Sequence, residues 1–233
     1  MTDSEARVAR VRPGVRPLVA GSLPRQIHEA LEEAIIGGEF APGSRLLADD
    51  IAAGYGVSRI PVREALSALG EAGWVETRPR YGVYVLERTR EELAELFEAR
   101  AGIEQEIARF AAARRTDQDL AQLHAIVETS RSASDHGDAE AVADAAVAFN
   151  AALRDAGGNG VLGGLSLALE KRARFYFSPV AALLGVEWVI GQDRLLRLLV
   201  DGDVEGAGRS ARQHIEETGR AVAALLGSDA FTS

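Results

Sequence analysis

Two arginines four residues apart, Arg59 and Arg63, are the side chains whose spacing most clearly suggests a chemistry. Positions i and i+4 share one face of an α-helix. The apolar residues of the segment fall on another face: Val62, Leu66 and Leu69. Ser58 precedes the segment as a predicted N-cap, and Pro61 lies in its first turn, where a missing N–H costs little. Guanidinium groups at the start of a helix can pair with guanine or grip phosphate, so this segment predicts a helix that enters the DNA major groove.

A second set of polar residues lies on apolar stripes farther along the chain. Four predicted helices each carry one polar residue among inward-facing apolar side chains: Arg100, Asn150, Gln192 and His214. Burying such a group without a partner costs ~1–3 kcal/mol, so the four together predict a shared cavity. Each also has an ordinary interpretation. Arg100 can pair with Glu104 one turn on, His214 can be a hydrogen-bonded core histidine, and the two amides can bridge helices.

Residues 21–87 predict a small winged helix-turn-helix domain. Three helices are expected, at about 22–37, 48–55 and 58–72, separated by turns that contain glycine or proline. After Gly73 the apolar pattern changes to period two, which predicts two strands of a wing joined by a loop at 78–82. Arg78 and Arg80 at the tip of this wing would reach the DNA backbone or minor groove. An ordinary pair of helices with a surface hairpin is the alternative, and it leaves these arginines unexplained.

Residues 88–227 contain no alternating apolar segment and predict an all-helical domain. Glycine, proline and capping residues divide it into six helices, at about 90–114, 117–136, 138–156, 160–177, 187–201 and 203–226. Because the connections are short, a six-helix bundle is expected. The predicted fold class is therefore mainly α, with a two-stranded wing in the first domain, and residues 228–233 are expected to form a C-terminal tail.

The acidic net charge of the chain, −9, is unevenly distributed. Residues 1–88 contain 11 arginines against 12 Asp and Glu, a balance of −1, whereas residues 89–233 contain 15 Lys and Arg against 23 Asp and Glu, a balance of −8. A basic patch in the first part can therefore bind phosphates while the remainder repels them. Residues 1–20 are expected to form a flexible arm, either without a role or in contact with DNA through its arginines: Arg7, Arg10, Arg12 and Arg16.

The composition excludes several other classes of protein. The chain has no cysteine, so it can form neither a disulfide nor a thiolate metal site. No apolar run reaches the ~18 residues that a membrane span needs, and the N-terminal residues lack the apolar core of a signal peptide. We therefore expect a cytoplasmic protein without a membrane partner. An enzyme is also not expected, because the apolar stripes offer only His214, with Glu104 as a possible carboxylate, and no Gly-rich phosphate loop is visible.

From Ser22 to about Val85 the chain resembles the GntR family of bacterial transcription regulators. The matching residues are Gly38, Pro42-Gly43, Val57-Ser58-Arg59, Pro61-Val62-Arg63-Glu64-Ala65-Leu66, Leu69, Gly73, Arg80 and Gly82. In relatives, the arginines that match Arg59 and Arg63 and the glycine that matches Gly82 contact DNA. The expected DNA-binding residues are Ser58, Arg59, Ile60, Arg63, Arg78, Arg80 and Gly82. Asp49 departs from the family, because many relatives have a DNA-contacting arginine at this position.

The helical part of the chain resembles the FCD effector domain of the FadR subfamily, and its six helices and short linker favour the VanR-like branch. In many FCD relatives an aspartate and three histidines hold a divalent metal. The matching positions here are Ala146, Asn150, Gln192 and His214. Because only the histidine is retained, we expect no bound metal or other cofactor.

Relatives also place an arginine near the effector at the position of Arg100. A guanidinium on an apolar wall suits a carboxylate or another anion. The expected effector-binding residues are therefore Arg100, Asn150, Gln192 and His214.

These features together predict a homodimeric, sequence-specific regulator that binds a palindromic double-stranded DNA operator, one recognition helix in each half-site. Most relatives are repressors that a metabolite releases, and we expect the same of this chain. A regulator of the same fold without an effector is the first alternative, with Asn150, Gln192 and His214 bonded to one another across a closed cavity. A helical-bundle enzyme and a purely structural scaffold are the alternatives from other classes.

Overall fold

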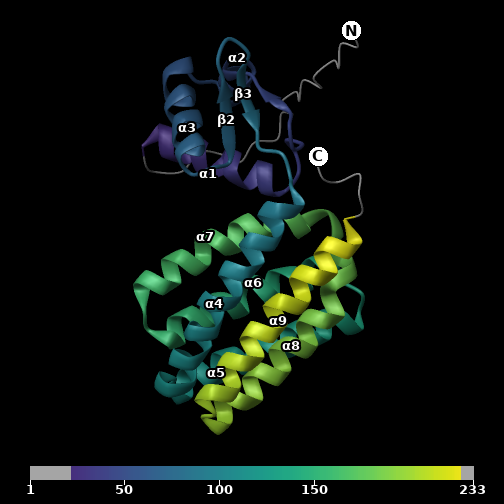
Figure 1. Ribbon diagram of the computed structural model, residues 1–233. Coiled ribbons are helices and arrows are strands. Elements are labelled where there is room, and N and C mark those ends of the chain that lie inside the picture. Colours follow the sequence, from purple (N-terminus) through teal and green to yellow (C-terminus); the bar gives the residue numbers. More distant parts are fainter. Residues whose placement is uncertain (1–21, 227–233) are drawn as a thin grey trace. The chain divides into compact units, whose positions relative to one another are not determined.

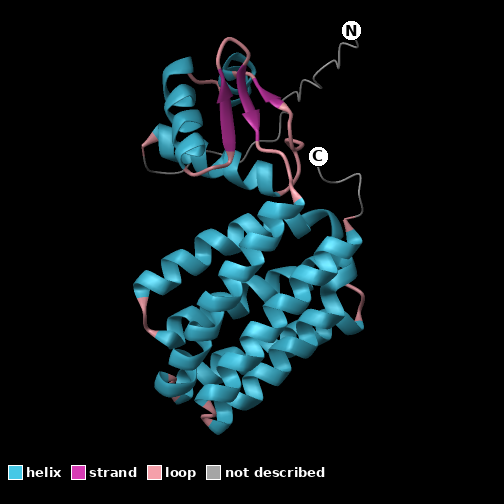
Figure 2. Cartoon of the chain, viewed as in Figure 1, coloured by secondary structure: helices cyan, strands magenta, loops and turns pink. Residues whose placement is uncertain are grey.

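The computed structural model describes residues 22–226, apart from the side chains of residues 181, 182 and 184–187. The described chain forms two compact units that meet between Arg88 and Thr89. The arm predicted at 1–20 and the tail predicted at 228–233 lie outside the described residues. Figure 1 labels the elements, and Figure 2 shows that strands occur only in the N-terminal part of the described chain.

The N-terminal unit combines three helices with a small sheet. Its elements are α1 (Leu23–Ile36), β1 (Arg45–Leu46), α2 (Ala48–Tyr55), α3 (Arg59–Glu71), β2 (Val75–Arg78) and β3 (Gly82–Val85). The sheet is antiparallel in the order β1-β3-β2, with Arg45 opposite Tyr84 in the outer pair. The predicted winged helix-turn-helix is confirmed, and β1 adds a third strand to the predicted two. A strand of two residues is too short to show an alternating apolar pattern, so no sequence pattern predicts it.

Ser22 and Ser58 occupy the N-cap positions of α1 and α3, but neither side chain makes the predicted capping hydrogen bond. A capping oxygen accepts a proton from the N–H of the second or third helical residue. Pro61 is the third residue of α3 and Pro24 the second of α1, so one of the two donors is missing in each helix. In α1 the backbone takes over, since Arg25 N donates to Ser22 O at 3.0 Å.

The core of the N-terminal unit forms where α1 packs against α3. One side of α3 is fully buried through Val62 and Leu69, and α1 contributes Ile27, Leu31 and Ile35. The indole Nε1 of Trp74, which precedes β2, donates to Glu32 Oε1 at 3.0 Å within this core. These contacts fix the buried side of α3 and leave the other side of the helix to solvent.

The described part of the C-terminal unit contains six α-helices. They are α4 (Arg90–Arg114), α5 (Asp117–Asp135), α6 (Ala139–Gly157), α7 (Gly160–Phe177), α8 (Ala181–Asp201) and α9 (Val204–Leu225). Five of the six predicted helices agree with the structure to within one residue at each end, but α8 begins at residue 181 rather than at about 187. The break predicted at Ser178-Pro179 is a single 3-10 turn, η1 (Ser178–Val180), after which the helix resumes at once.

Helix α4 organises this unit, because α6, α7 and α9 all pack against it (Figure 1). The tight α4–α9 contact depends on glycine, since a Cβ atom at Gly219 would lie 2.8 Å from Phe97 Cγ. The main apolar cluster joins α4, α5, α6, α8 and α9 through such residues as Ile107, Leu123 and Leu199. None of the helices within residues 22–226 combines the length and the apolar composition that crossing a membrane requires.

Candidate nucleic-acid interface and ligand cavity

The start of α3 presents its predicted DNA-facing residues to solvent. Ser58, Arg59, Ile60 and Arg63 are all exposed, and Ile60 keeps 69% of its surface although it is apolar. An exposed isoleucine gains nothing in water, but it can contact a thymine methyl group in the major groove. Among the described residues, Arg63 has no ion pair. The structure therefore brings these four residues together on the outer side of one helix turn.

Arg59 is held by the residue that departs from the family pattern. Its Nε lies 2.7 Å from Asp49 Oδ1, and both side chains are more than 60% exposed. Asp49 belongs to the first turn of α2, where a negative charge is favoured by the helix dipole. The carboxylate thus binds the guanidinium of the recognition helix.

The two predicted wing arginines have different surroundings. Arg80 is exposed at the turn between β2 and β3 and has a left-handed backbone, with φ of 71°. Arg78 lies along the sheet instead, where its Nε donates to Glu76 Oε1 at 2.6 Å and its guanidinium stacks on the Tyr84 ring at 4.4 Å. Arg80 is therefore available to a partner molecule, whereas the guanidinium of Arg78 is already bound within the sheet.

Arg45 was missed by the sequence reasoning. This residue of β1 lines a surface hollow together with Asp49, Arg63, Thr77 and Gly82. Its Nε is buried without a hydrogen-bond partner, and a Cβ atom at Gly82 would lie only 3.1 Å away from it. The glycine at the wing therefore makes room for an arginine. The one signal in the sequence was the glycine itself, because the short strand that carries Arg45 was not predicted.

In the C-terminal unit the four predicted effector-binding residues surround one cavity of about 120 Å³. Each comes from a different helix: Arg100 from α4, Asn150 from α6, Gln192 from α8 and His214 from α9. Apolar and aromatic side chains complete the wall, among them Phe149, Phe177 and Trp188. The arrangement is a small, mostly apolar pocket with a few polar groups, as in many ligand sites.

The positive charge of Arg100 is almost fully buried, and among the described residues only one distant carboxylate, that of Glu104, pairs with it. Its side chain is 4% exposed and lies 4.0 Å from Glu104 Oε1, so the simple pairing with Glu104 is present but long. That same Glu104 oxygen accepts a hydrogen bond of 2.7 Å from Ser166 Oγ. Arg100 Nε is buried without a hydrogen-bond partner. Burial, the largest effect, lowers the pKa of Arg100 while nearby Glu104 opposes it.

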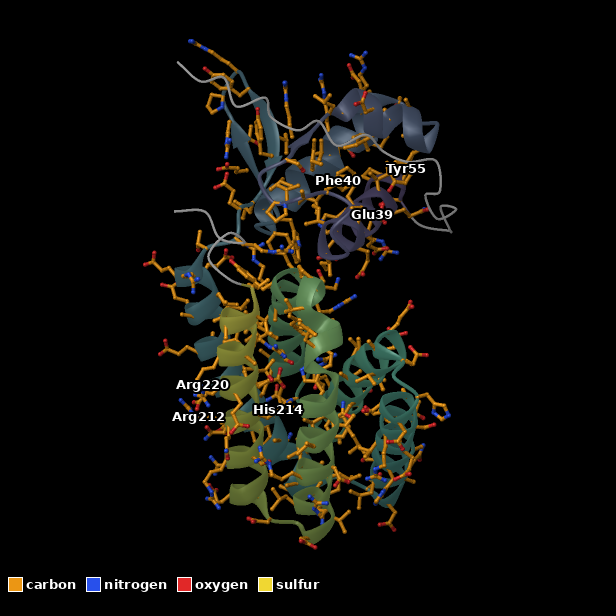
Figure 3. All side chains as sticks on the ribbon, turned by 90° about the vertical axis from the view of Figure 1, so that its right-hand side faces the viewer. Glu39, Phe40, Tyr55, Arg212, His214 and Arg220 are labelled. Carbon is orange, nitrogen blue, oxygen red and sulfur yellow. The ribbon has the colours of Figure 1, made fainter. Side chains whose placement is uncertain are left out.

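Gln192 and His214 add neutral polar groups to the same wall. Gln192 is 5% exposed, and its Oε1 has no hydrogen-bond partner among the described residues. Burial, together with the positive charges of Arg100 and Arg194, lowers the pKa of His214 to about 4. The imidazole is therefore neutral near pH 7. It also needs Gly191 of α8, because a Cβ atom there would lie 2.4 Å from His214 Nδ1. Figure 3 marks His214 on α9.

Helix α7 adds a polar edge to the cavity through Glu170, which was not among the predicted effector-binding residues. Glu170 lines the cavity and forms a buried ion pair of 2.8 Å with Arg154 of α6. Ser166, one turn earlier, binds Glu104 as described above. Ser166 and Glu170 are four residues apart on the buried face of α7. Their i, i+4 spacing was a usable signal, but α7 has no strong apolar stripe against which to recognise it.

The same helix is bound to the beginning of α4. Arg172 donates to Glu92 Oε1 at 2.6 Å, and the buried Tyr176 hydroxyl donates to Glu92 Oε2 at 2.5 Å. Thr89 caps α4 by accepting from Glu92 N, and its own N–H donates to the Tyr176 oxygen. Burial and the Glu92 carboxylate raise the pKa of Tyr176, which keeps the phenol protonated. Thus α7 joins the cavity to the residues that directly follow Arg88.

The donors at the family's metal positions do not fit a transition metal. Ala146 has no donor atom, and Asn150 and Gln192 offer neutral amides, which are weak ligands for such ions. His214 supplies the single imidazole. Within the described residues, no three His, Cys, Asp or Glu side chains come together as a metal site. No step of ligand recognition is therefore assigned to a metal.

Comparison with known proteins gives two family matches. Residues 23–85 match the family described as bacterial regulatory proteins, gntR family, and residues 95–217 match the FCD domain. The HTH-type transcriptional regulator McbR of Escherichia coli (strain K12) is 31% identical over 130 residues, which cover 56% of this chain and 59% of McbR. The Exu regulon transcriptional regulator of the same organism is 28% identical over 217 residues, 84% of this chain and 81% of that protein.

A solved structure shows the same fold. The structure of E. coli McbR/YncC covers 89% of this chain and 100% of its own, with a TM-score of 0.76 at 24% identity. The FCD match alone extends over more than half of the residues. The chain therefore belongs to the GntR family of bacterial regulatory proteins and carries that family's FCD domain.

Proposed function

We propose that this chain is a transcription regulator that binds a palindromic DNA operator as a homodimer and acts as a repressor that a small anionic metabolite releases. The observation that carries the DNA-binding part is the outer side of α3, where Arg59, Ile60 and Arg63 are exposed while the opposite side is buried. A dimer presents two such helices related by two-fold symmetry, which matches a palindrome. The six helices of the C-terminal unit support the VanR-like branch.

The hollow beside α3 supports a division of roles among the cations. Arg59 and Ile60 lie at the helix start, where side chains reach base edges. Arg45 and Arg63 line the adjacent hollow and are suited to phosphate oxygens, which guanidinium groups bind in a bidentate manner. Arg80 at the wing turn can reach the backbone or minor groove.

The cavity supports a small carboxylate as the effector. Its volume of about 120 Å³ corresponds to about four water molecules, which is room for a small ligand only. Arg100 Nε can donate to an anionic oxygen, and Gln192 Oε1 can accept from a hydroxyl or amine of the ligand. The neutral His214 and Asn150 can complete the polar contacts. The effector-free alternative requires these groups to satisfy one another, and the unpartnered Gln192 oxygen argues against it.

Helix α7 provides a physical link from the cavity to the start of α4 within the C-terminal unit. Glu170 and Arg174 line the cavity, and Arg172 and Tyr176 of the same helix bind Glu92. A ligand that shifts α7 would therefore shift the start of α4, which continues the chain from the DNA-binding unit. Such a ligand favours one of two arrangements, so ligand and DNA must affect each other's affinity reciprocally.

The first prediction concerns the recognition helix. Replacing Arg59 or Arg63 with alanine should cost ~1–3 kcal/mol of operator affinity for each arginine that contacts a base. Affinity is measured by fluorescence anisotropy on a duplex that the wild-type chain has selected from a random library. Arg25→Ala is the control, because Arg25 is exposed on α1 and pairs with Glu29. Unchanged affinity of the double variant R59A/R63A would refute DNA binding through α3.

The second prediction concerns the effector. Small carboxylates and sugar acids that bind the cavity should raise the unfolding temperature of the wild-type chain, because a ligand that binds only the folded state stabilises it. Gln192→Leu should reduce the shift, since the ligand loses an acceptor. Gln213→Leu is the matched control on α9, where Gln213 is exposed and bonded to Glu217. If no member of the panel shifts the wild-type chain, the effector-free regulator is the better description.

The third prediction concerns metal ions. Because the donor set holds one imidazole and no carboxylate at the family's positions, zinc and nickel should show no micromolar binding by calorimetry on the full chain. Micromolar binding of either metal that is abolished by His214→Ala would contradict this prediction and would show that the cavity holds a metal site.

The fourth prediction concerns pH. The pKa of His214 is about 4 in the folded chain and about 6.5 in the unfolded chain. As the pH falls, the unfolded chain therefore takes up a proton at this residue before the folded chain does. The contribution of His214 to the free energy of unfolding is therefore fully present above about pH 6.5, and it is lost as the pH falls toward 4. Between about pH 7.5 and about pH 5 this residue should lower the free energy of unfolding by on the order of 2 kcal/mol. Urea unfolding at both pH values measures the difference.

His214→Asn should remove this part of the pH dependence, whereas His124→Asn should not, because His124 is exposed on α5. Equal losses of stability in the wild-type chain and in H214N would show that His214 is not buried in its neutral form.

A further inference from the structure

The ion pair between Asp49 and Arg59 joins two helices through two exposed side chains. The distance between Arg59 Nε and Asp49 Oδ1 is 2.7 Å, and the side chains are 64% and 61% exposed. An exposed ion pair adds little to stability, because water screens the charges. What the pair changes is the direction in which the guanidinium points, since Arg59 stands at the free start of α3.

The geometry of the guanidinium decides what Arg59 can still bind. Arg has five N–H donors in a planar fork. The Asp49 carboxylate lies nearest to Nε, so the edge formed by the two terminal Nη groups is the part of the guanidinium that remains available. That edge can donate two parallel hydrogen bonds to guanine O6 and N7, the commonest specific contact in the major groove.

The same carboxylate discourages the competing contact with the DNA backbone. A phosphate that approaches Arg59 would also approach the negative charge of Asp49, and like charges at such distances repel. The hollow beside the pair contains two further arginines, Arg45 and Arg63, which have no such acidic partner among the described residues. Asp49 and Asp50 also line this hollow, but Arg45 and Arg63 balance their charges, so backbone binding can fall to these two arginines rather than to Arg59.

We propose that Asp49 is a specificity-determining residue: it positions Arg59 for guanine and prevents Arg59 from serving as a general phosphate contact. This inference rests on the proposed DNA binding through α3. It assigns a role to the position at which many relatives have an arginine. With Asp49 in place of an arginine, the protein has one phosphate contact fewer, and Arg59 makes a more selective contact with a base.

The experiment compares base preference rather than affinity alone. The full-length wild-type chain, D49A and D49N are each used to select duplexes from a random library, and binding to a fixed unselected duplex is measured in parallel. We expect wild type to prefer guanine at one position of each half-site and D49A to reduce that preference by about fivefold or more. Binding to the unselected duplex should rise for D49A, and D49N should keep part of the preference through its amide oxygen.

Asp50→Ala is the matched control, because Asp50 belongs to the same turn and lines the same hollow but has no ion pair with Arg59. If D50A and D49A change the profile equally, the effect is one of charge alone and the positioning role is refuted. An unchanged guanine preference in D49A, while R59A abolishes it, refutes the inference and leaves the proposed function intact. If wild type selects no sequence at all, the proposed function itself fails. Circular dichroism melting confirms that each variant is folded.

Discussion

The buried charge of Arg100 is the constraint on which the C-terminal unit depends. A guanidinium inside a helical bundle needs negative partners, and their removal would cost several kcal/mol. Glu104 provides one, but at 4.0 Å, and Glu104 is itself held by Ser166 of α7. The charges of Arg154 and Glu170 balance each other on the same side. Helix α7 is thus attached to α4 and α6 through polar contacts around Ser166 and Glu170, whereas its last part is anchored by the buried side chains of Ala173, Phe175 and Tyr176.

The polar contacts around Ser166 and Glu170 are the part of this attachment that can respond to the cavity. An apolar interface resists displacement because any gap loses close packing, whereas a hydrogen-bonded edge can exchange one partner for another. Glu170 faces the cavity, and Tyr176, less than two turns later, binds Glu92 at the start of α4. A local change of partners can therefore reach the residues that follow Arg88 without rearrangement of the main apolar cluster.

The sequence predicted those features that depend on periodicity and failed where polar partners are distant in the chain. Arg100, Asn150, Gln192 and His214 were found because each interrupts an apolar stripe, and all four line one cavity. Ser166 and Glu170 were missed because α7 is apolar on several sides, so its buried face could not be identified. Arg45 lies on a strand of two residues, which has no pattern to read. The absent caps of Ser22 and Ser58 depend on which N–H groups the nearby prolines remove.

Two arginines of this chain illustrate how solvent decides the role of an ion pair. Arg59 and Asp49 are in water, so their contact is short and inexpensive to rearrange, and DNA can share the guanidinium with the carboxylate. Arg100 and Glu104 are buried, so displacing Glu104 would leave an unpaired charge in the core. Under the proposed function, a ligand anion would bind at the unpartnered Nε of Arg100 and leave the bonds of Glu104 in place. Such a ligand would add a second negative charge beside Arg100, and Arg174, which also lines the cavity, carries a positive charge that offsets it.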